Sequence, residues 1–275
     1  MLTELKGKGG RICQQALDGE HRCPLIVRPS SEDVITGELC QLFRMLNSRW
    51  WLPDLLNMAL GTDRFSRQYH RRLRITPWEN RPRYPQRLLP WKEGSTQVDI
   101  TMRWENPSTT VYVEAKYGSD LSLSSAGHST ESEYPGDQLI RNIRVGLHEC
   151  GWFDENRLFE PEKRDFVVIL WSPAKGHDLV RKYRDPEKLR ASIPHSDSLL
   201  GLPALPFVGE LSYGDVIDVL RRQQTRLTLP ERKAVDAFCE YLTFKLEGLH
   251  TLPGRKEKAP NQSHLSLEDD QASCE

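Results

Sequence analysis

The sequence predicts an α/β fold in which a central mixed β-sheet is flanked by helices. Residues 95–117 alternate apolar and polar side chains in two stretches separated by a turn, which is typical of a β-hairpin. Residues 164–172 form a continuous apolar run, which is typical of a strand buried on both faces. Between them, residues 137–147 carry apolar side chains at helical spacing. A helix in that place would connect the hairpin to a parallel strand.

The hairpin has a specific predicted register. Residues 105–108, Glu-Asn-Pro-Ser, are turn-forming, so the residues on either side of them would pair. Counting back one pair at a time places Asp99 opposite Glu114, and Lys116 projects from the same face as Glu114. Like charges directly opposite each other destabilise a hairpin, so we expect a divalent metal ion to offset this pair. A slip of one residue would separate these side chains, so the prediction depends on the register.

The pattern of Asp99 followed by Glu114-Ala115-Lys116 in an apolar strand resembles the catalytic motif of the PD-(D/E)XK nuclease superfamily. Val98 stands where that family usually has a proline, a position at which the family varies. The resemblance implies a restriction-endonuclease-like core and a metal-dependent nuclease. It also implies that Mg²⁺, for which Mn²⁺ could substitute, is bound by Asp99, Glu114 and the Ala115 carbonyl. Lys116 would assist the attacking water.

Two predicted helices extend the resemblance. The helix that begins near Ser30 carries Glu38 at the border of its apolar stripe. The family often has a glutamate on its first core helix that reaches the metal site, so the resemblance gives Glu38 a catalytic and metal-binding role. A surface ion pair is the alternative. Gln138, near the start of the helix after the hairpin, is similar to a glutamine that would orient the site or contact the phosphate.

Basic residues are concentrated in one part of the chain. Residues 64–92 contain nine Lys or Arg against one acidic residue, Glu79, and a strand is expected there near the edge of the sheet. Such a patch could bind phosphates, and a solvated loop is the alternative. The predicted nucleic-acid contacts are Arg71, Arg72 and Arg74 in this patch and Arg141 and Arg144 in the helix after the hairpin.

Composition limits the alternatives. The chain has 275 residues and a net charge of −1, so it lacks the global charge of a nucleic-acid-binding protein. Its six cysteines show no C-x-x-C spacing, which argues against a zinc site and fits a reducing cytosol. No signal peptide or membrane-length apolar run is visible, so we expect a cytoplasmic protein without a membrane partner.

The chain divides into three predicted parts. Residues 1–29 would be a loosely ordered lead-in, residues 30–250 the nuclease-like domain, and residues 251–275 a disordered tail. Within the domain, Pro53 should break the apolar segment 50–60. Further elements are expected as a flexible loop over 118–136, helices over 178–191, 214–224 and 230–247, and a strand over 207–211.

These observations together predict a Mg²⁺-dependent endonuclease that hydrolyses phosphodiester bonds, with DNA rather than RNA as the expected substrate. The alternative is a non-catalytic member of the same fold that binds nucleic acid, or an adaptor subunit of a larger complex such as a defence complex. Because many family members dimerise, a homodimer is one expected arrangement.

Overall fold

The computed structural model describes residues 32–117, 121, 134–154 and 162–248 of the chain. Within these residues, five strands form one mixed sheet. They are, in chain order and also in sheet order, β1 (Arg71–Arg81), β2 (Thr96–Glu105), β3 (Thr109–Ala115), β4 (Asp165–Ser172) and β5 (Val208–Ser212). β1, β2 and β3 are antiparallel neighbours, whereas β4 and β5 continue the sheet in parallel with β3. The lead-in, the tail and most of the loop 118–136 lie outside the described residues.

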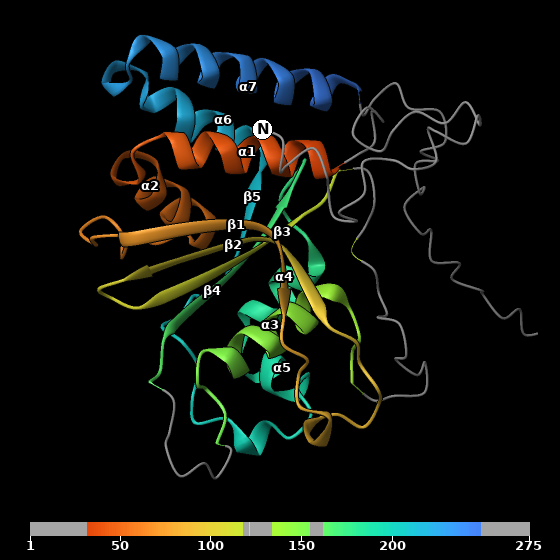
Figure 1. The fold of residues 1–275 in the computed structure, drawn as a ribbon. Helices are drawn as coiled ribbons and strands as arrows, with labels where there is room; N and C mark the ends of the chain where they lie inside the picture. The colour runs from red at the N-terminus through yellow and green to blue at the C-terminus, as the bar shows by residue number, and fades with distance from the viewer. Residues whose placement is uncertain (1–31, 118–120, 122–133, 155–161, 249–275) are drawn as a thin grey trace, which may run out of the picture.

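Helices cover both faces of this sheet (Figure 1). One face carries α1 (Glu32–Met45), α2 (Ser48–Leu60), α6 (Tyr213–Arg222) and α7 (Leu229–Gly248), and the other carries α3 (Gln138–Glu149), α4 (Asp178–Arg184) and α5 (Pro186–Ala191). The α/β class with a mixed sheet flanked by helices is therefore confirmed. No described helix is both long enough and apolar enough to cross a membrane.

Alternating side chains of the central strands supply two separate hydrophobic cores. Val113 and Ile169 pack in the core beneath α1 and α2, whereas Tyr112 and Val168 pack in the core beneath α3. Every residue of β3 is buried, because this strand has a neighbour on each side and helices on each face. Glu114, near the end of β3, therefore carries its charge in a fully buried strand.

The predicted register of the hairpin is confirmed. β2 and β3 pair from Trp104 and Thr109 next to the turn to Ile100 and Val113. This register places Asp99 and Glu114 at the next position of the ladder.

Two sequence-based expectations about helices are wrong. Pro53 does not break the apolar segment, because α2 is continuous from Asn47, whose side chain caps it, to Gly61, which adopts a left-handed conformation with φ of 66°. The burial of the apolar face of α2 outweighs the hydrogen bond that Pro53 cannot form. The single helix expected over 178–191 divides at Asp185, because this residue is extended before Pro186, which begins α5.

Close packing of α3 on β4 gives a first testable prediction. A Cβ atom on Gly146 would lie 2.1 Å from Cζ of Phe166, so Gly146→Ala is a steric clash in the core. We expect this substitution to lower the free energy of unfolding by about 1–3 kcal/mol, the usual cost of overpacking. Urea denaturation monitored by circular dichroism measures this difference. Gly214→Ala is the matched control, because the nearest atom to its added Cβ is 3.6 Å away. Equal stability of Gly146→Ala and the wild type would contradict the packing described here.

Candidate functional site

The structure brings Asp99, Glu114 and Lys116 together at one end of the hairpin. Asp99 and Glu114 are 1% and 0% exposed, and Lys116 is 7% exposed. The Lys116 Nζ atom lies 2.8 Å from Oε1 of Glu114. The backbone N–H of Ala115 donates a hydrogen bond of 3.0 Å to Oδ2 of Asp99. The Asp99 side chain is thus fixed to the backbone of β3 between Glu114 and Lys116.

A residue of α3 that sequence reasoning missed also holds Glu114. The side-chain amide of Asn142 donates a hydrogen bond of 2.8 Å to Oε2 of Glu114, and Asn142 is completely buried. The two carboxylate oxygens of Glu114 therefore have different partners, Asn142 on Oε2 and Lys116 on Oε1. Gln138 lies four residues before Asn142, on the same face of α3 and one turn closer to its N-terminus. This spacing of four residues could have predicted from the sequence that Asn142 faces the site together with Gln138.

Lys116 is held at both its backbone and its ammonium group. Its backbone N–H donates to the Trp171 carbonyl at 2.8 Å, and the Tyr213 hydroxyl donates to its carbonyl at 2.8 Å. Burial alone would lower the pKa of Lys116, but the carboxylates of Glu114, Glu32 and Asp99 outweigh it and raise this pKa above its ordinary value. Lys116 is therefore a cation at neutral pH.

The glutamate of α1 beside Lys116 is Glu32 and not the predicted Glu38. Oε1 of Glu32, the first residue of α1, lies 3.6 Å from Nζ of Lys116. Glu38 is exposed, and its charge acts instead on Tyr241 of α7, whose pKa is raised to about 12 chiefly by burial. Sequence reasoning missed Glu32, which lies six residues before Glu38 in the same helix.

Three of the predicted phosphate contacts lie away from this site. Arg71, Arg72 and Arg74 are exposed on β1. Arg71 pairs with Glu105, at the turn end of β2. Six residues of extended chain separate Glu105 from Asp99, a distance of about 20 Å. The structure therefore does not bring these arginines to the carboxylates.

The two arginines of α3 form a buried ion-pair cluster instead. Arg144 is 0% exposed, and its Nη2 lies 3.0 Å from Oε1 of Glu93. Arg141 shares this oxygen at 3.3 Å and donates to the carbonyls of Gly94 and Ser95 at 3.0 and 2.9 Å. Both arginines anchor the segment before β2 onto α3. Arg144 is therefore not accessible to a phosphate, which corrects the expectation, whereas Arg141 keeps part of its side chain exposed.

The cluster fits a magnesium ion in part. Among the described residues, no three His, Cys, Asp or Glu side chains are arranged as a metal-binding group. Mg²⁺, however, is commonly held by one or two carboxylates together with waters and substrate phosphates. Asp99 and Glu114 supply two buried carboxylates, and the ammonium group of Lys116 contacts Glu114. Their hard oxygen donors suit a divalent cation.

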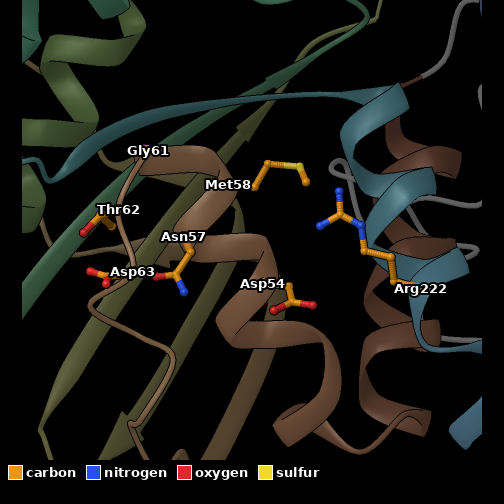
Figure 2. A pocket seen from close by; sticks show the side chains of 7 residues that line it. All are labelled: Asp54, Asn57, Met58, Gly61, Thr62, Asp63 and Arg222. Carbon is orange, nitrogen blue, oxygen red and sulfur yellow. The ribbon is translucent and has the colours of Figure 1, made fainter.

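The pocket in Figure 2 lies elsewhere. It has a volume of about 560 Å³ between α2 and α6 and is lined by Asp54, Asn57, Met58, Gly61, Thr62, Asp63 and Arg222. The next residue, Arg64, pairs with Asp165 at the start of β4, at the opposite end of the sheet from Lys116. Polar side chains that line the pocket have structural hydrogen bonds. Asp54 accepts one from Gln223, and Asn57 bonds Phe65 and Ser66 in the loop after α2. We do not assign the candidate site to this pocket.

No family model, curated protein sequence or solved structure matches this chain. The candidate site is therefore defined by its residues and their geometry alone.

Proposed function

We propose that this protein is a Mg²⁺-dependent nuclease with a restriction-endonuclease-like core that hydrolyses phosphodiester bonds, with DNA as the expected substrate. The observation that carries the proposal is the buried cluster of Asp99 in β2, Glu114 in β3 and Lys116 directly after β3. The element order supports it as well. An antiparallel strand pair, a helix and a parallel strand follow one another, as the resemblance leads us to expect.

Each residue of the cluster has a distinct role in this proposal. Asp99, Glu114 and the Ala115 carbonyl would hold the ion. When bound, Mg²⁺ supplies charge neutralisation at the scissile phosphate and lowers the pKa of a bound water. Lys116 holds the attacking water with its ammonium group and stabilises the negative charge that develops on the phosphate. Asn142 fixes the orientation of Glu114 through Oε2.

Two further residues complete the arrangement. Glu32 contacts Lys116 from α1 and limits where its ammonium group can move. The resemblance gave Glu38 a catalytic and metal-binding role, but Glu38 is exposed, and Glu32 is the glutamate of α1 that reaches the cluster. Gln138 stands at the start of α3, on the face that carries Asn142, where a contact with the substrate backbone would be made.

One observation favours a second candidate function. Lys116 and Glu114 already form a close, buried ion pair, so the cluster has internal charge compensation. In a non-catalytic nuclease-fold protein this pair would be structural. Such a protein would bind nucleic acid without a metal ion, or would serve as an adaptor in a larger complex.

A cleavage assay separates the two candidates. Purified wild-type protein is incubated with plasmid DNA, single-stranded DNA and RNA in Mg²⁺, Mn²⁺ or EDTA, beside Asp99→Asn and Glu114→Gln. We expect metal-dependent cleavage by the wild type and none by either variant, because each loses a charged ligand at nearly unchanged shape. Glu105→Gln is the control at the exposed end of β2 and should cut normally.

Two results would contradict the proposal. Cleavage that survives in both variants would place the activity outside this cluster. Binding of nucleic acid without a metal ion and without cleavage would support the binding protein instead.

A further inference from the structure

A second pocket follows β1 and precedes β2. It has a volume of about 530 Å³ and is lined by Arg83, Tyr84, Pro85, Gln86, Lys92 and Glu93. A pocket of this size can take a group as large as a nucleotide. Arg83 and Lys92 are exposed, and neither side chain forms an ion pair with another described residue. Two cations at the pocket are thus available to a ligand.

Two arginines of α3 lie next to this pocket. Glu93 is the one acidic lining residue, and its carboxylate is shared by the guanidinium groups of Arg141 and Arg144. Burial lowers the pKa of Arg144, and the carboxylates of Glu93 and Asp137 oppose this effect only in part. Nε of Arg144 is buried and has no hydrogen-bond acceptor among the described residues. Because the Glu93 carboxylate is held between these two guanidinium groups, it repels an anion in the pocket less than an unpaired carboxylate would.

The pocket is joined to the candidate catalytic site through α3. Arg141 binds the carbonyls of Gly94 and Ser95, and the next residue of α3, Asn142, binds Glu114. Four residues of extended chain, roughly 13 Å, separate Ser95 from Asp99. Phosphates follow one another at about 3.4 Å along the axis of a DNA strand. A DNA strand whose scissile phosphate lies next to Glu114 could therefore place another of its phosphates, a few nucleotides away, in the pocket.

We propose that this pocket binds the phosphate backbone of the substrate nucleic acid a few nucleotides from the scissile bond, through Arg83 and Lys92. The inference rests on the proposed nuclease function. It assigns the phosphate contacts to Arg83 and Lys92 in place of the arginines of β1. Arg141 and Arg144 act beneath the pocket, where they neutralise Glu93. The basic stretch 64–92 thus divides into a part that meets the substrate and a part that does not.

Salt-dependent binding tests this assignment. The double variant Arg83→Glu/Lys92→Glu is compared with Arg71→Glu/Arg74→Glu, which has the same charge change at exposed positions of β1. Binding of a short labelled DNA duplex is measured by fluorescence anisotropy in EDTA over a range of salt concentrations, and thermal unfolding confirms that both variants fold. We expect the pocket variant to bind at least about 10-fold more weakly, and its slope of log K against log salt to fall by about 1.8. The β1 variant should keep more of the wild-type affinity and slope.

The inference is overturned if the pocket variant binds the duplex as the wild type does, or if the β1 variant loses as much affinity. A second result would also overturn it. If both proteins bind the duplex equally, but inorganic phosphate raises the melting temperature of the wild type alone, the pocket binds a free anion and not the nucleic-acid backbone. Since EDTA prevents metal-dependent cutting, the two proposals fail separately. A pocket effect without any cleavage in Mg²⁺ refutes the nuclease alone, and cleavage without a pocket effect refutes the pocket alone.

Discussion

Replacing Lys116 by methionine is expected to lower the rate of phosphodiester cleavage by about 100-fold to 1,000-fold, the range typical of losing one group that stabilises the negative charge of the transition state. Methionine keeps much of the buried aliphatic stem but removes the ammonium group that lies 2.8 Å from Glu114. Single-turnover cleavage at saturating Mg²⁺ measures the effect on the chemical step. Lys175→Met is the matched control, because Lys175 is exposed and paired with Asp215 on the surface.

The same variant has a second expected result that does not depend on activity. The ammonium group and a metal ion compete for the carboxylate of Glu114, so removing the ammonium should strengthen metal binding. We therefore expect Mg²⁺ to raise the melting temperature of Lys116→Met more than that of the wild type. Wild-type cleavage rates in Lys116→Met, or an equal response of both proteins to Mg²⁺, would contradict the role assigned to Lys116.

Glu93→Gln is expected to lower the free energy of unfolding by about 3–5 kcal/mol, the usual cost of removing one partner from a buried ion pair. The substitution leaves Arg144, which has no exposed surface, without its carboxylate. Urea denaturation measures the difference. Glu105→Gln, which breaks the exposed pair with Arg72, should cost no more than about 1 kcal/mol.

A double variant separates the lost ion pair from a general effect of substitution at Glu93. Glu93→Gln/Arg144→Met removes the carboxylate and the buried cation together, so it should be more stable than Glu93→Gln alone. If the double variant is less stable by the sum of the two single effects, the charges do not interact as the structure indicates.

The parts of the site that could be predicted from the sequence are those fixed by local pattern. Alternating side chains and a four-residue turn define the register of β2 and β3, and this register alone brings Asp99 and Glu114 together. Helical spacing likewise places Gln138 at the start of α3. These features depend on residues that are close in the chain.

The remaining parts depend on how distant elements pack. Whether Glu32 or Glu38 meets Lys116 is decided by where α1 crosses the sheet, which no local pattern specifies. Arg144 has the sequence context of a surface cation, and its partner Glu93 lies 51 residues earlier. The same limit applies to Pro53, whose effect on α2 was overridden by burial against the core.

The position of β1 has a consequence for how molecules of this protein meet one another. β1 is an edge strand of the described sheet, so one side of its backbone has no neighbouring strand there. Exposed edges of this kind promote aggregation, because a second chain can extend the sheet. Arg71, Arg72 and Arg74 place three like charges along this edge, and Pro77 lacks a backbone N–H group. These three arginines, which the sequence suggested as phosphate contacts, therefore oppose aggregation through the edge of the sheet.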